Sequence, residues 1–578
     1  MKKNNPYHKF TLTTLMLILF SYSCTNKFEE INTNEFIFNE ASPEELFTGV
    51  VKNTLDLVGG VLNDQMYNTY ASYYGGKGGQ FNRFFFTEQG LDSYWKRFYV
   101  KVLKNNQAII DNYSNDPAYA NRVYIAKIWK SYVFSVLVST FGPVPYQDAL
   151  KGLNAAKYDS EEFIYTEILA ELKEASENID VSGDALQQDP LFDGDINKWK
   201  KFANTLRLKL AIRISEGFPA LAQQHGSDAM TNETNLVNSN ADNVFMKWGT
   251  AQENWSFNYA RYIFIQANED VVPYMNFHFL LNLKTYKDPR LVALVEPSSE
   301  PILIRDEVFM AGSTTDKITV EYELPFLGRP LGGNAAVDGW ALDANENILN
   351  GLPNRRYSRP KLDLFMAPDM SYNIITYAET NFIKAEAQLK GWGGSKTAEQ
   401  YYYDGIDASF EQYGVTNGSD YKNKEGIKWN TSSIGDRGLF GVVTSGISDD
   451  PLDKIVRQRW LAGYNQGHDM WCVQKRTRIL PLIDQFEPDG ATGLDYAPLP
   501  ERMIYPPLIE GSLNNEALQD AINNLGGNTL YNALKINKAY TPVQWENLVP
   551  EINQDFAKHF YGDSEDDLIA AGVIYTII

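Results

Sequence analysis

The spacing of hydrophobic residues along the chain predicts a series of amphipathic helices. In residues 121–141, apolar side chains recur at steps of three and four, which places them on one face of a helix. These side chains are Ile125, Ile128, Trp129, Tyr132, Val133, Val136 and Leu137. Gly142 and Pro143 follow at once, and because neither residue favours helical backbone, the helix is predicted to end there.

The same pattern predicts further helices on both sides of an irregular middle region. A second helix is expected to begin near Ser160, because a hydroxyl at the N-cap and two acids in the first turn stabilise a helix N-terminus. Similar hydrophobic spacing recurs in residues 196–214, 376–389, 397–413 and 451–471. Helices that follow one another with short connections are typical of stacked helical hairpins. We therefore expect a mainly α, tetratricopeptide-like fold with long loops and a few short strands.

Residues 240–375 differ from the helical segments. They are rich in Gly, Asn, Pro, Trp and Tyr and contain few periodic runs, which indicates long loops with a few short strands. Loops of this length in a compact protein are usually functional or disordered, and the many aromatic residues favour function. Because these loops interleave with the helices, residues 44–578 are expected to form a single domain.

The N-terminus has the layout of an export signal. The first ten residues carry three lysines and no acid, and residues 12–20 form an apolar run that is too short to span a bilayer. Small residues at Ser21 and Ser23 suit cleavage just before Cys24, and a cysteine at a new amino terminus receives acyl chains such as palmitate in bacterial lipoproteins. We expect residues 1–23 to be a lipoprotein signal peptide, Cys24 to be lipidated, and residues 24–43 to form a flexible tether. A plain signal peptide or a membrane anchor is the alternative.

Charge and cysteine content narrow the possible partners. The formal net charge is -21, so phosphate neutralisation would not hold this chain on nucleic acid or on anionic lipid headgroups. Membrane attachment is therefore expected through the lipid at Cys24. The other cysteine, Cys472, lies in the aromatic-flanked run MWCVQ and is interpreted as a small buried hydrophobe, not a nucleophile.

Sequence motifs for catalysis are absent from the chain. The histidines after position 24 are His225, His278, His468 and His559, and none has the paired spacing of a zinc site. There is no G-x-S-x-G elbow and no P-loop, and the glycine cluster at 75–79 lacks the Lys-Ser/Thr that opens a nucleotide-binding helix. We therefore expect no enzyme activity, no metal and no cofactor. A glycoside hydrolase remains an alternative, because its two acids need not be close in sequence.

Aromatic residues on loops are the strongest candidates for ligand binding. Flat rings stack on sugars or peptides, while Asn, Arg and Tyr side chains bond to hydroxyl or amide groups. One cluster joins a glycine-rich segment to several rings, and a second begins near residue 252. The candidate ligand-binding residues are Tyr73, Tyr74, Phe85, Asn254, Trp255, Tyr259, Arg261 and Trp340. The alternative for each ring is a position in the buried core.

Five separated segments, in a fixed order, resemble the motifs of one family. They are the leader at Cys24 followed by Lys27, Glu29 and Glu30; STFGPVPY at 139–146; TYAETNFIKAEA at 376–387; RQRWLA at 457–462 with KRT at 475–477; and PERMIYP at 500–506. With these segments the chain resembles the SusD/RagB-like outer-membrane nutrient-binding lipoproteins of Bacteroidetes over nearly its whole length. The motifs belong mostly to the scaffold, so none of the candidate ligand-binding residues is carried over from the family.

The resemblance implies a function at the cell exterior. A protein of this family would be anchored to the outer membrane by its lipid, dock on a SusC-like TonB-dependent transporter, and act as a lid that holds an oligosaccharide or oligopeptide at the mouth of the barrel. A surface glycan hydrolase and a helical-repeat scaffold that binds only protein are the alternatives. The sequence leaves open which glycan or peptide is bound.

Overall fold

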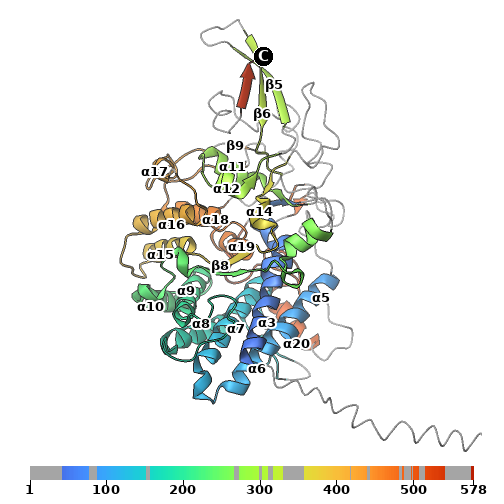
Figure 1. The fold of residues 1–578 in the computed structure, drawn as a ribbon, viewed down its shortest axis with the longest axis vertical. Helices are drawn as coiled ribbons and strands as arrows, with labels where there is room; N and C mark the ends of the chain where they lie inside the picture. Colours follow the sequence, from blue (N-terminus) through green and yellow to red (C-terminus); the bar gives the residue numbers. More distant parts are fainter. Residues whose placement is uncertain are drawn as a thin grey trace, which may run out of the picture.

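A computed structural model describes residues 42–76, 88–151, 156–265, 272–298, 302–309, 317–329, 357–416, 418–435, 437–438, 443–480, 485–486, 496–497, 499–506, 515–540 and 574–577. Helices make up most of the body, and the strands are few and mostly short (Figure 1), so the predicted mainly α fold class is confirmed. Among the described residues, no helix has both the length and the apolar character that a membrane crossing requires.

The first described helix, α3 (Pro43–Leu55), begins at the position where the sequence predicts that the tether ends. Ser42 and Glu45 form a capping box: the Ser42 hydroxyl accepts from the Glu45 amide at 3.2 Å, and the Glu45 carboxylate accepts from the Ser42 amide at 3.0 Å. Pro43 occupies the first turn, where its missing N–H costs nothing. The chain continues helically through η1 (Asp56–Val61), η2 (Asn63–Tyr67) and α4 (Asn68–Tyr70).

The remaining helices follow the predicted order and pack as neighbours. In particular, α7 packs on α8, α8 on α9, α9 on α10, and α15 on α16, which is the expected arrangement of stacked hairpins. Their bounds are α5 (Glu88–Lys96), η4 (Arg97–Leu103), α6 (Lys104–Tyr113), α7 (Ala120–Phe141), α8 (Glu161–Asn178), α9 (Ile196–Arg213), α10 (Pro219–Thr231), α15 (Tyr377–Leu389), α16 (Ala398–Gln412), α17 (Gly418–Lys422), α18 (Pro451–Ala462), α19 (Gly467–Thr477) and α20 (Asn515–Asn524).

The helix predicted over residues 451–471 is in fact two helices, α18 and α19. The break falls at Gly463, and Asn465 adopts the left-handed conformation with φ of 70°. Two asparagines from the N-terminal helices hold Asn465 in place: Asn63 donates to its carbonyl at 2.8 Å, and Asn68 donates to its side-chain oxygen at 2.9 Å. The periodicity continues across the break, so the local pattern alone does not reveal it.

Large aromatic side chains pack between the helices in the buried hydrophobic clusters of the molecule. Phe47 of α3 packs edge-on against Trp129 of α7 and Trp199 of α9, with ring centroids 6.0 and 5.6 Å away. The buried indoles also find acceptors for their N–H groups; Trp460 donates to the Ala71 carbonyl and Trp471 donates to the Pro500 carbonyl, both at 2.8 Å. Segments distant in sequence are thereby fixed against each other.

The middle region contains short strands, as predicted, and also helices that the sequence did not predict. The strand pairs, all antiparallel, are β1 (Tyr74–Gly76) with β3 (Tyr274–Met275), β2 (Val244–Lys247) with β8 (Ser371–Ile375), and β4 (Val295–Glu296) with β7 (Arg359–Pro360). The helices are α11 (Phe277–Thr285), α12 (Leu291–Leu294) and α14 (Leu362–Phe365). An N-cap explains α11, because the Asn276 side chain accepts from the His278 amide at 2.8 Å.

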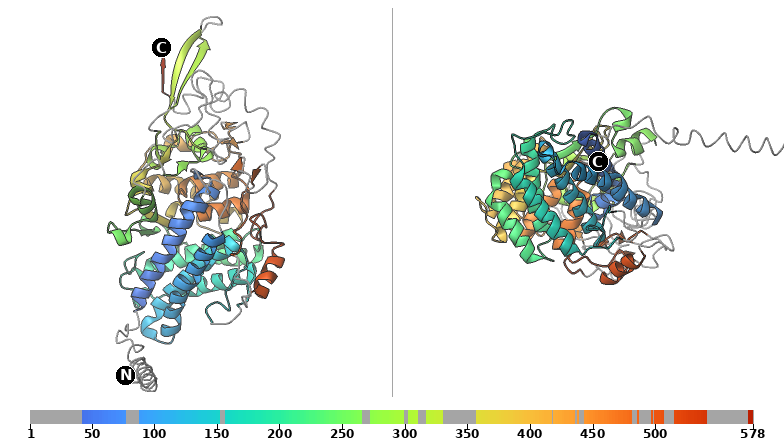
Figure 2. Two further views of the ribbon diagram at one scale, coloured as in Figure 1. Left: turned by 90° about the vertical axis from the view of Figure 1, so that its right-hand side faces the viewer. Right: turned by 90° about the horizontal axis from the view of Figure 1, so that it is seen from below.

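A hairpin of longer strands projects from the helical body (Figure 2). Its strands, β5 (Ile302–Phe309) and β6 (Lys317–Leu324), pair antiparallel from Ile302 opposite Leu324 to Phe309 opposite Lys317. The C-terminal strand β13 (Ile574–Ile577) adds to β6 from the other side. Two further antiparallel pairs are formed by β9 (Arg437–Gly438) with β10 (Val443–Thr444) and by β11 (Gln485–Phe486) with β12 (Tyr496–Ala497).

The turn at 139–146 and the segment at 500–506 lie against each other. The Arg502 guanidinium donates to the Phe141 carbonyl at 3.0 Å, and the Tyr505 hydroxyl donates to the Pro143 carbonyl at 2.6 Å. Gly142 has a φ of 88°, which favours glycine at the end of α7. Two sequence motifs separated by more than three hundred positions therefore form one contact.

The C-terminal segment is also held by a buried carboxyl group, that of Glu161 at the start of α8. Its Oε1 accepts from the Lys535 amide at 3.1 Å. Burial raises the pKa of Glu161 to about 7, and hydrogen bonds from the 535–536 backbone only partly oppose this effect. The group is thus a carboxyl that the fold prefers to keep neutral.

Candidate ligand-binding surface

The second aromatic cluster of the sequence forms a short irregular segment on the surface. It contains the 3₁₀ turn η8 (Gln252–Asn254) and the π-helix η9 (Tyr259–Ile265). The segment is pinned to the chain that follows α14: the Ser256 amide donates to the Pro368 carbonyl at 2.8 Å, and the Asn258 side chain donates to the Phe365 carbonyl at 3.1 Å. Hydrogen bonds to backbone thus fix the loop that carries the candidate rings.

Three rings gather on this segment, and we call them the η9 aromatic surface: Trp255, Tyr259 and Phe264. The Trp255 ring lies 4.9 Å from Tyr259 at 74° and 4.8 Å from Phe264 at 59°. Phe264 is 52% exposed, and Trp255 and Tyr259 are half-buried. The Trp255 N–H donates to the Thr250 carbonyl at 2.9 Å, which fixes the orientation of the indole. The rings are therefore oriented and still accessible to a ligand.

Polar groups lie beside these rings. Asn254 is exposed, and no hydrogen bond of its side-chain amide or of the Tyr259 hydroxyl occurs within the described ranges. The Tyr259 amide donates to the Ser256 hydroxyl at 3.2 Å, so the backbone under the ring is held while the phenol remains available. An amide and a phenol next to stacked rings can bond to the hydroxyl groups of a sugar.

Arg261 packs on rings that lie next to the η9 aromatic surface in the sequence. Its guanidinium lies over the rings of Phe257 and Tyr262, at 5.7 and 5.5 Å from their centroids. It also approaches the buried carboxylate of Asp64 in η2 at 4.0 Å, and the Tyr262 hydroxyl donates to that carboxylate at 2.8 Å. Arg261 thus connects η9 to the N-terminal helices, and we assign it a positioning role.

Phe264 is a candidate that sequence reasoning missed. It follows Trp255 and Tyr259 at steps of four and then five residues, and the second step matches the longer turn of a π-helix. A search for α-helical spacing alone does not detect this pattern. The available signal was the aromatic content of the run WSFNYARYIF together with the exposed loop in which it lies.

Tyr73 and Tyr74 do not belong to this surface. Both are at most 1% exposed, and the Tyr73 hydroxyl donates to the Trp460 carbonyl at 2.7 Å. Burial raises the pKa of both phenols. The next position requires a glycine, Gly75, because a Cβ there would lie 2.0 Å from the Arg329 carbonyl oxygen. These two rings are core residues, which corrects their sequence-based assignment as ligand contacts, because rings without exposed surface offer no face to a ligand.

Three other predicted positions, Cys24, Phe85 and Trp340, lie outside the described residues. Of the eight candidate ligand-binding residues, the structure therefore brings together Asn254, Trp255, Tyr259 and Arg261 on one segment. Tyr94 of α5 lies close to this group, since its hydroxyl donates to Gln65 of η2 at 2.6 Å and the Arg261 charge acts on it. The ring of Tyr94 is half-buried.

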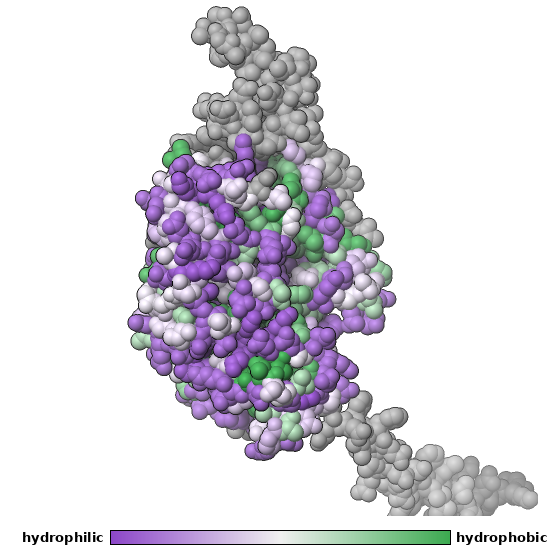
Figure 3. Space-filling view, turned by 60° about the vertical axis from the view of Figure 1, so that its left-hand side comes forward, coloured by the Kyte–Doolittle hydropathy of each residue, from purple (hydrophilic) through white to green (hydrophobic). Residues whose placement is uncertain are grey.

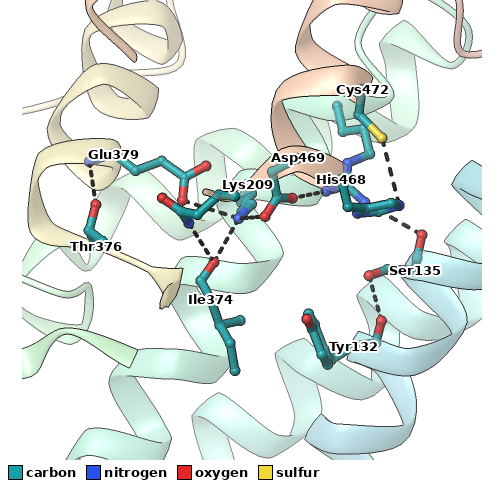
Figure 4. Close-up of polar contacts among 12 residues, drawn as sticks. Tyr132, Ser135, Lys209, Ile374, Thr376, Glu379, His468, Asp469 and Cys472 are labelled. Carbon is teal, nitrogen blue, oxygen red and sulfur yellow. Dashed lines mark hydrogen bonds and ion pairs between the residues drawn. The ribbon is translucent and has the colours of Figure 1, made fainter. Parts of the chain in front are cut away.

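A cluster of ionisable side chains lies in the interior, between α9, α15, α18 and α19 (Figure 4). The Lys209 ammonium is 2.7 Å from the Asp469 carboxylate and 3.1 Å from that of Glu379, and it also donates to the Ile374 carbonyl at 2.9 Å. Arg213 pairs with Asp469 at 2.5 Å, and Arg459 pairs with Glu379 at 2.8 Å. All of these side chains are at most 10% exposed. We call this set the buried ion network.

Cys472 lies at the edge of the buried ion network, next to His468. The Cys472 sulfur is 3.9 Å from His468 Nε2, and the same nitrogen is 3.0 Å from the Ser139 hydroxyl. Burial raises the pKa of Cys472, but the positive charges of His468, Arg213 and Lys475 outweigh it and lower the pKa to about 5. The predicted burial of Cys472 is confirmed, whereas its surroundings are polar.

The pairing of a thiol with an imidazole is also found in nucleophilic catalysis, but this pair is closed to a substrate. Cys472 is 4% exposed and His468 is 2% exposed, with large rings packed around them. The cluster joins α7, α9 and α19, so we assign it a structural role. The accessible candidate site is the η9 aromatic surface.

Comparison with known proteins identifies the family. The SusD-like_2 family, described as starch-binding and associating with the outer membrane, matches residues 34–303 and 341–506. Solved structures with the same fold include a chitin-binding protein at 23% identity and TM-score 0.67, covering 86% of this chain and 100% of that protein. A SusD homolog from Bacteroides uniformis has 22% identity and TM-score 0.66. A chitin-binding SusD homolog from Flavobacterium johnsoniae has 19% identity and TM-score 0.66. Each of these two comparisons covers 86% of this chain and 99% of the other protein.

No curated protein matches the chain. The solved structures are less than 25% identical to it, so they establish the fold and leave the ligand to other evidence. The family match covers both helical blocks and the η9 aromatic surface. The protein belongs to the SusD-like family of starch-binding proteins that associate with the outer membrane.

Proposed function

We propose that this protein is a lipid-anchored, outward-facing outer-membrane protein that binds an oligosaccharide on the η9 aromatic surface and acts as the lid of a TonB-dependent transporter. The exposed group of Trp255, Tyr259 and Phe264, in a chain of this family, is the observation that carries the proposal. The family description names starch, and two structural relatives are chitin-binding, which favours a glycan over a peptide.

The geometry suits stacking on sugar rings. The Trp255 plane is tilted by 74° and 59° from its two neighbours, so the three rings do not lie in one plane. Apolar faces of a sugar would lie on these rings, while the Asn254 amide and the Tyr259 phenol would bond to its hydroxyl groups. Because the loop is already fixed by backbone hydrogen bonds, little ordering would be needed on binding.

Calorimetric titration of the purified protein with chito-oligosaccharides, malto-oligosaccharides and oligopeptides tests the ligand class. We expect binding to at least one glycan series, and a loss of about tenfold or more in Trp255→Ala. The matched control is Trp429→Ala, which removes a half-buried indole between α17 and α18. Binding to peptides only, or equal glycan affinity in Trp255→Ala and the parent protein, would contradict the proposal.

The lipid anchor is tested separately at Cys24. We expect the protein to fractionate with the outer membrane and to incorporate a labelled palmitate analogue, and Cys24→Ser to abolish both. Protease treatment of intact cells reports the orientation, because an outward-facing chain is degraded. Release of the unchanged wild-type protein into the medium without lipid would overturn this part of the proposal.

The transporter partner distinguishes the lid model from a protein-only scaffold. Purification from detergent-solubilised outer membranes is expected to recover a large β-barrel transporter together with this chain.

The glycan hydrolase alternative is distinguished by incubating the protein with the bound glycan and analysing the products. Release of shorter sugars would favour the hydrolase, whereas recovery of the glycan intact favours binding without turnover.

A further inference from the structure

A second concave site lies away from the η9 aromatic surface. A cleft of about 560 Å³ separates the connection from α11 to α12 from the chain that leaves α16 and forms α17. Its walls include Val292 and Val415, and Val292 is 64% exposed. In Figure 1, α16 and α17 lie at the upper left, whereas η9 belongs to the segment between β2 and β3. The cleft is thus built from elements that take no part in the proposed glycan site.

The floor of the cleft is rigid. Tyr421 is 1% exposed, and its hydroxyl accepts from the Gln458 side chain at 2.7 Å and from the Arg290 guanidinium at 3.5 Å. Arg290 is itself paired with the buried Asp288 at 2.6 Å, so the charge of Asp288 is already neutralised. The shape of the cleft therefore does not depend on a mobile side chain at its base.

Two lysines, Lys287 and Lys424, line the cleft. Lys424 donates to the Tyr286 carbonyl at 2.6 Å, which fixes its ammonium and leaves two of its three N–H groups available. Lys287 is exposed and projects from a left-handed turn with φ of 45°. Within the described part of the chain, neither lysine forms an ion pair with a carboxylate. Burial and the nearby charge of Lys287 lower the pKa of Lys424, and the charges of Asp288 and Asp420 only partly oppose this effect.

Such an arrangement is unusual in a chain with a net charge of -21, where acids outnumber bases 73 to 52. Two ammonium groups that form no ion pair, beside an aliphatic wall, attract an anion that carries an apolar group. The one carboxylate among the lining side chains is that of Asp420. It favours a ligand with a single negative charge, since a second charge would approach this carboxylate.

We propose that this cleft is a second binding site, which takes a small monocarboxylate with an apolar body between Lys287, Lys424 and the valine wall. The carboxylate would lie between the two ammonium groups, and the apolar body would cover Val292 and Val415. The face seen when the left-hand side of Figure 1 comes forward is mainly hydrophilic, with hydrophobic residues in separate groups (Figure 3), which suits a small ligand and not a broad protein interface.

Titration of the purified protein with N-acetyl-leucine, followed by ligand-observed NMR, tests the proposal. We expect millimolar binding of N-acetyl-leucine and much weaker binding of N-acetyl-leucinamide, which has the same body without the charge. Glucuronate distinguishes the source of the carboxylate, because it offers a sugar acid in place of a peptide terminus. Inorganic phosphate is expected to compete poorly, because most of it carries two charges at pH 7.5.

Lys287→Glu is expected to weaken N-acetyl-leucine binding about tenfold or more. The matched control is Lys101→Glu, the same charge change at an exposed lysine of η4, with no expected effect. Val292→Ser tests the apolar wall and is expected to weaken N-acetyl-leucine several-fold while leaving acetate unchanged. Thermal unfolding measures whether each variant is folded. If a lysine variant is unstable, Val292→Ser still tests the cleft, because Val292 is exposed and its replacement should leave the fold intact.

The proposal would be overturned if neither N-acetyl-leucine nor glucuronate bound at millimolar concentration. It would also be overturned if N-acetyl-leucine and N-acetyl-leucinamide bound equally well, or if Lys287→Glu left the affinity for N-acetyl-leucine unchanged. Trp255→Ala should leave N-acetyl-leucine binding intact, because Trp255 does not line the cleft. Failure of the glycan proposal and failure of this one are therefore distinguished by separate variants and separate ligands.

Discussion

The buried ion network and the η9 aromatic surface use polar and aromatic groups in opposite ways. In the network, each charge meets partners from other helices, and its side chains are at most 10% exposed. On the surface, Phe264 is 52% exposed, and the polar groups beside the rings bond to little else in the described ranges. Reactive side-chain types are therefore a poor guide to the candidate site in this molecule, because the reactive groups are buried and the exposed groups are aromatic and polar.

The largest effect is expected from breaking the buried ion network at Asp469. Asp469→Asn would leave Lys209 and Arg213 buried with too little negative charge, so the free energy of unfolding should fall by about 3–5 kcal/mol. Urea denaturation measures this change. The control, Asp92→Asn, breaks the exposed pair with Lys96 and should change stability by less than about 0.5 kcal/mol. Equal effects of the two variants would mean that the buried ion network contributes no more to stability than an exposed ion pair.

The Asp469 carboxylate also makes the stability of the buried ion network depend on pH. Burial alone would raise the pKa of Asp469, but Lys209 and Arg213 outweigh it and lower the pKa to about 2 from an ordinary 3.8. The stabilisation is therefore present above pH 3.8 and is lost as the pH falls toward 2. Asp469→Asn should lack this part of the acid transition.

Glu161 provides the contrasting case of a buried carboxyl whose burial outweighs the charges of the nearby lysines, Lys535 and Lys475. Its pKa is raised from 4.5 to about 7, so the stability it favours is fully present below pH 4.5 and is lost as the pH rises through 7. Relative to Glu161→Gln, the wild-type free energy of unfolding should fall across this window by at most about 3 kcal/mol. Urea denaturation at several pH values measures the difference. Parallel curves for both proteins would mean that Glu161 is not the titrating group.

Arg261 shares features of both regions: its side chain is 30% exposed, and its guanidinium lies 4.0 Å from the carboxylate of buried Asp64. Arg261→Met should lower the free energy of unfolding by about 1 kcal/mol and weaken glycan binding several-fold, since the support of η9 is lost. Denaturation and calorimetric titration measure the two effects. Full binding with reduced stability would show that the rings hold their positions without Arg261.

The smallest change in stability is expected at Phe264. Phe264→Ala removes an exposed ring, so the free energy of unfolding should change by less than about 0.5 kcal/mol while glycan affinity falls by about fivefold. The control is Ile265→Ala, at the adjacent residue, which is 74% exposed and carries no ring. If both variants bind equally well, Phe264 does not contact the ligand.

Local sequence patterns predict the parts of this molecule that local chemistry determines. The helix over 121–141 ends at Gly142 as expected, and the Ser160 cap begins α8. The division of 451–471 into α18 and α19 was missed, because the left-handed Asn465 depends on Asn63 and Asn68, about four hundred positions earlier.

The candidate site shows the same limit. Trp255, Tyr259 and Arg261 could be predicted because they lie on one continuous segment with aromatic neighbours. Tyr73 and Tyr74 were misassigned because a glycine-rich neighbourhood resembles a loop. Both are buried in one hydrophobic cluster, where Tyr73 packs on Trp460 and Phe279 from distant helices. The buried ion network could not be predicted either, since spacing along a helix does not reveal which opposite charge it will meet.

The contact between the turn at 139–146 and the segment at 500–506 has a consequence for how the chain reaches its native state. The end of α7 cannot complete its contacts until residues 500–506 have been synthesised, because the Phe141 carbonyl accepts a hydrogen bond from Arg502. Trp471 of α19 depends on the same segment, since its indole N–H donates to the Pro500 carbonyl. Contacts of such long sequence separation slow folding and discourage premature compaction. A version of the chain truncated before residue 499 would lack the segment that completes this packing, and we expect it to remain incompletely folded.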